Sequence, residues 1–120
     1  MKYAPRPCII KAREAALDPE DLPRFFVSRA NAGDVEGLVA LYEPDAVLAG
    51  PEGRTLVGTE AIRSFYAALL ADRPQFEPEE QRPALLRGDL ALTSSRLTDG
   101  TVRAEVARRQ ADGTRLWAVD

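Results

Sequence analysis

The segment NAGDVEGLVALYEPDAVLAGPEG, which runs from Asn31 to Gly53, decides the fold. Its first half has apolar residues at helical spacing, and Pro44 predicts the end of that helix because proline cannot continue the hydrogen-bond ladder. A short apolar strand over residues 46–49 follows and ends at Gly50. The end of this strand would hold a catalytic carboxylate firmly, yet the sequence has a glycine there. Whether the protein is an enzyme depends in part on that position.

Two further helices are predicted around this segment. Asp18, followed by proline, predicts the capped start of a first helix, and Gly33 predicts its end. Asp34 is expected to cap the central helix. Thr59 predicts the cap of a third helix, which Pro74 is expected to end. Each helix has one apolar face, and these faces are expected to form the core.

The second half of the chain has the pattern of antiparallel strands. Residues 75–88 predict an edge strand interrupted by proline. Two Asp-Gly pairs, at 99–100 and 112–113, are typical of hairpin turns and separate three further strands. Helices followed by a meander of strands indicate an α+β domain with helices on one face of a curved sheet. Such a sheet is expected to enclose a cavity with one open mouth, where small ligands bind.

Composition excludes several classes of function. The chain has 120 residues, a net charge of −3, no histidine and one cysteine, Cys8. We expect an N-terminal arm over residues 1–17 and a single domain over residues 18–120. Histidine-dependent nucleophilic catalysis and the common zinc sites are excluded, and neither a metal nor a cofactor is expected. Scattered basic residues argue against nucleic-acid binding, and no segment has the length of a membrane span, so a cytoplasmic protein is expected.

The order of these elements resembles a known superfamily. The segments NAGDVEGLVALYEPDAVLAGPEG and LVGTEAIRSFYAALL, with EVARRQADGT and WAVD further on, are similar to nuclear-transport-factor-2-like proteins of the SnoaL-like and ketosteroid-isomerase-like branch. The resemblance implies a cone-shaped fold, in which three N-terminal helices pack in the concave face of a curved, mostly antiparallel sheet. It also implies an apolar pocket and a homodimer formed through the outer face of the sheet.

The same resemblance predicts that the isomerase chemistry is missing. Ketosteroid isomerases use an aspartate base with a tyrosine and a protonated aspartate as hydrogen-bond donors. Their tyrosine corresponds to Phe26, their base to Gly50 and their protonated aspartate to Ala107. None of these three side chains can transfer a proton, and Gly50 is expected to use a positive φ. We therefore expect an apolar cavity in which no acidic side chain lies within hydrogen-bonding distance of a tyrosine hydroxyl.

A few polar residues remain as candidates for chemistry. With Ala107 at the position that the resemblance gives it, Glu105, Ala107 and Arg109 share one face of their strand, because side chains alternate, and that face is expected to point into the cavity. A guanidinium beside Glu105 would lower the pKa of that acid. Asp120 and Glu52 are the other carboxylates that could act as a base, and Asp120 is expected to fray at the chain end.

Three functions remain open from the sequence. The first is a small-molecule-binding domain for an apolar or acidic metabolite. The second is an enzyme of the polyketide cyclase, dehydratase, isomerase or epoxide hydrolase type that uses Glu105, Asp120 or Glu52 as its base. The third is a structural or partner-binding dimer with a closed cone. The residues expected to line the pocket are Phe26, Tyr42, Leu48, Gly50, Phe65, Tyr66, Leu92, Glu105, Ala107, Arg109 and Trp117.

Overall fold

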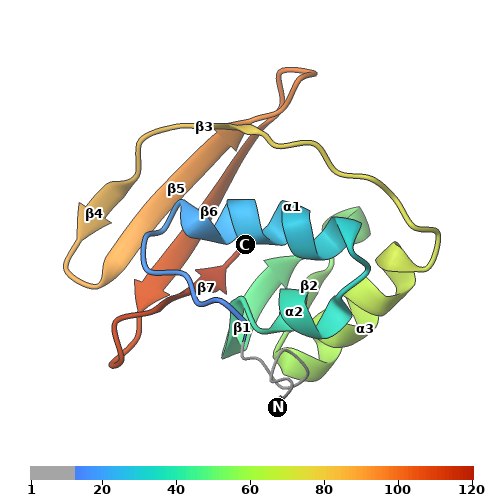
Figure 1. Ribbon diagram of the computed structural model, residues 1–120, viewed down its shortest axis with the longest axis horizontal. Helices are drawn as coiled ribbons and strands as arrows, with labels where there is room; N and C mark the ends of the chain where they lie inside the picture. Colours follow the sequence, from blue (N-terminus) through green and yellow to red (C-terminus); the bar gives the residue numbers. More distant parts are fainter. Residues whose placement is uncertain (1–12) are drawn as a thin grey trace, which may run out of the picture.

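The computed structural model describes residues 13–120, which form a mixed α+β fold with three α-helices and a curved, open sheet (Figure 1). The helices are α1 (Asp21–Asn31), α2 (Val35–Val39) and α3 (Thr59–Leu70). The strands are β1 (Tyr42–Ala49), β2 (Thr55–Val57), β3 (Glu80–Gln81), β4 (Leu85–Arg87), β5 (Leu90–Arg96), β6 (Val102–Arg109) and β7 (Arg115–Val119). A single turn of 3₁₀ helix, Pro51–Gly53, connects β1 to β2. Cys8 and most of the expected arm lie outside the described residues.

The sheet has seven strands within the described residues. Its order is β2-β1-β7-β6-β5-β3, and β4 also pairs with β5. All neighbours are antiparallel except β1 and β7, which run parallel and bring the end of the chain beside the first strand. Both predicted hairpins are present, β5–β6 around Asp99-Gly100 and β6–β7 around Asp112-Gly113. The mixed α+β class and the mostly antiparallel sheet are therefore confirmed.

The helices lie against different parts of the sheet. In Figure 1, α1 crosses in front of β5 and β6, while α3 lies beside β1 and β2. Residues 71–79 have no regular secondary structure and run from the end of α3 past α1 to reach β3. None of the helices within residues 13–120 has the length and apolar character needed to cross a membrane.

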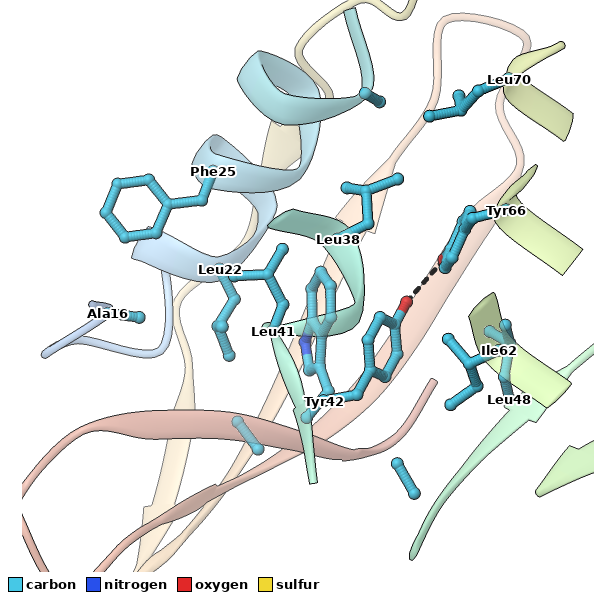
Figure 2. Packing of buried hydrophobic residues seen from close by; sticks show 14 of the residues in the cluster. Ala16, Leu22, Phe25, Leu38, Leu41, Tyr42, Leu48, Ile62, Tyr66 and Leu70 are labelled. Atoms are coloured by element: carbon cyan, nitrogen blue, oxygen red, sulfur yellow. Dashed lines mark hydrogen bonds between the residues drawn. The ribbon is translucent and has the colours of Figure 1, made fainter. Parts of the chain in front are cut away.

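The core is formed by apolar side chains from all three helices and from the central strands (Figure 2). Leu22, Leu38 and Ile62, one from each helix, are fully buried. Tyr42 and Trp117, which occupy paired positions on β1 and β7, pack with ring centroids 5.2 Å apart. The amphipathic faces predicted from the sequence thus supply the residues that hold the helices on the sheet.

Several predicted helix boundaries are wrong. The central helix ends at Val39, not at Pro44, because Pro44 lies inside β1 where the pairing with β7 is irregular. A proline is tolerated at such a position because no ladder hydrogen bond is lost. The third helix ends at Leu70, four residues before Pro74, and Gly58 rather than Thr59 occupies its cap position, with a φ of 90°.

The first helix also begins differently. The carboxylate of Asp21, rather than that of Asp18, accepts the backbone N–H groups of Leu17 and Asp18, both at 3.1 Å. The predicted cap of α2 is confirmed, because Asp34 accepts from the backbone N–H of Gly37 at 3.0 Å. These differences concern one turn or less of helix, so the order of elements is unaffected.

Candidate active site

A cavity of about 840 Å³ lies between the helices and the inner face of the sheet. Its walls come from α1, α3, residues 76–79, β1, β3, β5, β6 and β7, and from Asp120 after β7. Most of the wall is apolar and is formed by Phe26, Leu48, Phe65, Tyr66, Leu69, Phe76 and Trp117. A cavity of this size is within the range that holds small organic ligands. The interior of the fold is therefore not completely filled by side chains.

Glu105 is the most perturbed acid of this cavity. Its side chain is 7% exposed, and the hydroxyl of Thr93, on the paired strand β5, donates to its Oε1 at 2.8 Å. Burial, helped by the nearby Asp120 and Glu79 charges, raises the pKa of Glu105 to about 7, while the Thr93 hydrogen bond and the charge of Arg103 oppose the rise. A carboxyl with this pKa holds and releases a proton near neutral pH, as a general acid or base must.

Asp120 is the second acid and is connected to two tyrosines. The hydroxyl of Tyr42 donates to Oδ2 of Asp120 at 2.6 Å, and the hydroxyls of Tyr42 and Tyr66 lie 2.6 Å apart (Figure 2). Since the single hydroxyl proton of Tyr42 goes to Asp120, Tyr66 donates to Tyr42. Burial raises the pKa of Asp120, and the Tyr42 hydrogen bond opposes that rise. The pKa of each tyrosine is also raised, chiefly by burial, so both hydroxyls stay protonated.

The backbone holds Asp120 in place. Its N–H donates to the carbonyl of Val47 at 2.9 Å, and its own carbonyl accepts from the N–H of Ala49 at 2.7 Å. The expectation that Asp120 frays is therefore wrong, because the parallel pairing of β7 with β1 extends to this residue.

A further polar group lies at the β5–β6 side of the cavity. The hydroxyl of Ser95 donates to Glu79 at 2.6 Å, and Arg103 lies 3.7 Å from the other oxygen of the same carboxylate. Ser95 and Arg103 are paired across β5 and β6, one step along the same face from the Thr93–Glu105 pair. The inner face of these strands thus changes from apolar, at Ala91 and Ala107, to polar.

The side chain of Asn31 helps to hold residues 71–79, which form one wall of the cavity. The amide of Asn31 donates to the carbonyl of Phe76 at 3.0 Å and accepts from its N–H at 2.7 Å. Both hydrogen bonds lie between residues 45 positions apart, so Asn31 ties residues 71–79 to the end of α1. Phe76 then packs edge-on against Phe26, with ring centroids 5.4 Å apart.

The structure brings only part of the expected pocket together. The expected residues that line the cavity are Phe26, Leu48, Phe65, Tyr66, Glu105, Trp117 and Asp120. Tyr42 is buried and does not line the cavity, but its hydroxyl is hydrogen-bonded to two residues that do, Asp120 and Tyr66. The expected residues that do not line it are Gly50, Glu52, Leu92, Ala107 and Arg109.

The structure explains why these five residues do not line the cavity. Leu92 lies between the inward-facing Ala91 and Thr93, so alternation places it on the outer face, where it is 45% exposed. Glu52 is exposed on the turn after β1. Gly50 precedes that turn with a φ of −97°, so the expected positive φ is wrong, and Glu52 has the positive φ instead.

The expected pairing of Glu105 with Arg109 is also wrong. Arg109 is exposed and lies opposite Arg115 in the β6–β7 ladder, while Glu105 accepts a hydrogen bond from Thr93 on the neighbouring strand. Ala107, between them, is fully buried against the core. Because no guanidinium of residues 13–120 forms an ion pair with Glu105, burial dominates and the pKa of this acid is raised rather than lowered.

The expectation of a chemically inert cavity fails for a related reason. The carboxylate of Asp120 lines the cavity and lies 2.6 Å from the hydroxyl of Tyr42. The prediction that no acidic side chain of the cavity lies within hydrogen-bonding distance of a tyrosine hydroxyl is therefore wrong. The positions assigned from the resemblance, Phe26, Gly50 and Ala107, do carry no ionisable group. The acids of this protein reach the cavity from other positions in the fold.

Sequence reasoning missed four polar residues of the site. Thr93 and Ser95 alternate with exposed neighbours on β5, so the period of two contained a signal for them. Arg103 is two residues from Glu105, and the same alternation places both on one face. Glu79 gave no signal, because it lies in an irregular segment whose path depends on the Asn31–Phe76 hydrogen bonds. Within residues 13–120, no three potential metal-ligating side chains of His, Cys, Asp or Glu lie close enough to hold an ion.

Comparison with known proteins agrees with this architecture. The model of the SnoaL-like domain family matches residues 24–120. The chain therefore belongs to the SnoaL-like domain family, in the nuclear-transport-factor-2-like group that its sequence resembles.

Three solved structures illustrate the shared fold. A protein of Thiobacillus denitrificans ATCC 25259, assigned as a calcium/calmodulin-dependent protein kinase type II association domain, is 16% identical with a TM-score of 0.72, over 89% of this chain and 94% of its own. A ketosteroid isomerase-like protein of Erwinia carotovora atroseptica SCRI1043 is 22% identical with a TM-score of 0.63, over 83% and 88%. A protein of unknown function with a cystatin-like fold from Nostoc punctiforme PCC 73102 is 20% identical with a TM-score of 0.65, over 86% and 85%. At these identities the likeness concerns the fold alone.

Proposed function

We propose that this protein is an enzyme that transfers a proton to or from a small apolar substrate held in the cavity. The observation that supports this most directly is the position of Glu105, a buried carboxyl with a pKa of about 7 in the wall of an apolar cavity. Acids with perturbed pKa values in clefts are enriched at catalytic sites. The reaction class is an isomerisation, dehydration or ring closure that begins with removal of a proton from carbon.

In this proposal the two acids have different roles. Glu105 removes the proton, because its pKa lies near the working pH and its second oxygen is not engaged by Thr93. Asp120 orients the polar group of the substrate, and its own position is fixed by the hydroxyl of Tyr42 and by the backbone of β1. The apolar walls exclude water, which strengthens both interactions.

A neutral probe substrate tests this without knowledge of the natural one. In the base-promoted opening of 5-nitrobenzisoxazole, a carboxylate takes the proton from the ring carbon, the N–O bond breaks, and a nitrile and a phenolate form. We expect the wild-type rate to rise with pH around a midpoint near 7. Glu105→Gln should lower the rate by at least about 100-fold, the usual contribution of a positioned base. Asp45→Asn, which removes a charge from an exposed position outside the cavity, is the matched control.

The proposal fails if Glu105→Gln reacts as fast as the wild type with the same pH profile. If Asp120→Asn loses the activity and Glu105→Gln does not, the assignment of the base to Glu105 is wrong and Asp120 takes that role. Both variants are nearly isosteric with the native residue, and circular dichroism checks that each is folded.

A binding domain without chemistry is the second candidate. It is favoured by Phe26, which carries no hydroxyl at the position where the resemblance expects a tyrosine donor. This candidate predicts that apolar ligands quench the fluorescence of Trp117, which lines the cavity, while the protein has no effect on the ring opening. The two functions are therefore separated by the same pair of measurements.

We also propose that two copies associate through the outer face of the sheet. Register places six apolar residues in one row across the strands, and several of them are largely exposed. The row consists of Leu85, Leu92, Val106, Val119, Val47 and Val57. An exposed apolar row of this length is unusual for a monomer. Sedimentation should find a dimer, and Leu92→Glu should dissociate it. A monomer at high micromolar concentration would contradict this.

We also propose the packing of the helices that the resemblance implies. The three helices fill the concave face of the sheet, and the cavity is the part of that face which they leave open. We also propose a cytoplasmic location. The chain has a single cysteine and needs no internal disulfide, so it does not require an oxidising compartment, and cell fractionation tests the location.

A further inference from the structure

The charged groups of the cavity wall are mostly acidic. Among the described residues, it is lined by five carboxylates, from Glu20, Glu77, Glu79, Glu105 and Asp120, and by two guanidinium groups, from Arg24 and Arg103. Each arginine already has an acidic partner. Arg24 bonds to Asp21 at 3.0 Å, and Arg103 lies 3.7 Å from Glu79.

The two most buried acids have no cation of residues 13–120 in direct contact, although the charge of Arg103 lowers the pKa of both. Among residues 13–120, neither Glu105 nor Asp120 forms an ion pair, and their hydrogen bonds come from the neutral hydroxyls of Thr93 and Tyr42. The two charges also repel each other, because Asp120 raises the pKa of Glu105. Buried carboxylates without a cation are costly, so a positive group brought by a ligand would be stabilised there.

The other walls suit a cation as well. Phe26 lies at the centre of an aromatic group and contacts Tyr66, Phe76 and Trp117, with ring centroids 5.9, 5.4 and 6.3 Å away. Aromatic ring faces attract ammonium groups, and they attract them more strongly where water is excluded. Aromatic rings around a pair of carboxylates are a suitable environment for an organic cation, whereas a carboxylate ligand would meet repulsion at the same place.

We propose that the ligand of this cavity is an amine, whose protonated nitrogen lies between Glu105 and Asp120 while its apolar body packs on Phe26, Phe65 and Leu69. This inference rests on the proposed small-molecule site and adds the chemical class of its ligand. It departs from the acidic metabolite that the sequence left open, because the cavity has no arginine free of an acidic partner among the residues that line it.

A ligand series that differs only in charge tests the proposal. The probes are 3,3-diphenylpropylammonium, 3,3-diphenylpropan-1-ol and 3,3-diphenylpropanoate, which share one apolar body. Binding is measured by quenching of the single tryptophan, Trp117, in the full chain. We expect the ammonium to bind about tenfold more tightly than the alcohol, and the carboxylate to bind most weakly.

The pH dependence gives an independent readout on the same protein. A cation prefers ionised carboxylates, so its affinity should rise as the pH increases through about 7, while the affinity of the alcohol should not. The charged groups that face Glu105 are Asp120, Glu79 and Arg103. Glu105→Gln should remove most of the preference for the ammonium and leave alcohol binding within about threefold, whereas Asp45→Asn should change neither.

Two results would overturn the proposal. One is an ammonium that binds no more than about threefold more tightly than the alcohol, or more weakly than the carboxylate. The other is that none of the three probes quenches Trp117.

The ring-opening assay uses a neutral substrate, so an active protein that shows no preference for the ammonium refutes the ligand class and leaves the proposed chemistry standing. An inactive protein that prefers the ammonium refutes the chemistry and leaves the ligand class standing.

Discussion

Replacing Glu105 with glutamine should change how the stability of the protein depends on pH. The substitution keeps the size of the side chain and its ability to accept the hydrogen bond from Thr93. It removes the one carboxyl whose pKa is raised to about 7. Any difference between the two proteins that grows with pH therefore comes from the ionisation of Glu105.

The sign and size follow from the two pKa values. Between 4.5 and about 7 the folded protein binds more protons at this site than the unfolded chain does, so the free energy of unfolding falls as the pH rises through this range. At about 1.4 kcal/mol per pKa unit, the full shift corresponds to roughly 3 kcal/mol. Solvent in the open cavity screens part of this energy, and we expect about 2 kcal/mol. The variant should match the wild type near pH 4 and exceed its stability by that amount near pH 8.

Urea denaturation at a series of pH values, followed by the fluorescence of Trp117, measures this difference. The exposed Asp45→Asn serves as a control for the loss of one negative charge, and its curve should run parallel to that of the wild type. If the curve of Glu105→Gln is also parallel to the wild type between pH 4 and pH 8, the reasoning about the buried acid is refuted.

Three further predictions concern the surroundings of the cavity. Tyr42→Phe should raise the pKa of Asp120, because it removes a hydrogen bond that lowers it, and carboxyl NMR checks the direction; an unchanged pKa would contradict the network. Asn31→Ala should cost about 1–3 kcal/mol and speed amide exchange at Phe76, since it leaves two backbone groups unpaired; unchanged exchange would show that the loop is held otherwise. Ile62→Ala, at a fully buried position, should cost about 2–5 kcal/mol in urea denaturation, and a loss below about 1 kcal/mol would mean that the core is looser than the structure shows.

The sequence predicted the fold well because its strongest signals are local. Apolar periodicity identified the faces of α1, α2 and α3, and the two Asp-Gly pairs fixed both hairpins. The boundaries that were wrong depend on contacts between distant segments. Pro44 is part of a strand because β7 pairs beside it, and β7 lies about 70 residues further along the chain.

The candidate site was harder to predict for the same reason. Glu105 was placed on the inner face from the position that the resemblance gave Ala107 and from the alternation of the strand, but its partner was expected four residues away on the same strand. The actual partner, Thr93, faces it across the β5–β6 ladder, and that register was not available from spacing alone. Its pKa was consequently expected to fall, although the structure raises it.

Asp120 shows the limit of assigning roles from a resemblance. The three positions carried over from the isomerases have no ionisable side chains, which suggested an inert cavity. The parallel pairing of β7 with β1 nevertheless brings Asp120 to Tyr42, and no local pattern in the sequence indicates this contact over 78 residues. Acids in a cavity of this fold can thus come from more than one set of positions.

The titration of the Glu105 carboxyl tests the central claim most directly. Carbon NMR of glutamate side chains, with the Glu105 signal identified by its loss in Glu105→Gln, measures the midpoint. Because Glu105 is buried and its hydrogen-bond partner is the neutral hydroxyl of Thr93, we predict a midpoint near 7. A midpoint close to 4.5, the value of an unperturbed glutamate, would contradict the account and remove the basis for proton transfer at neutral pH.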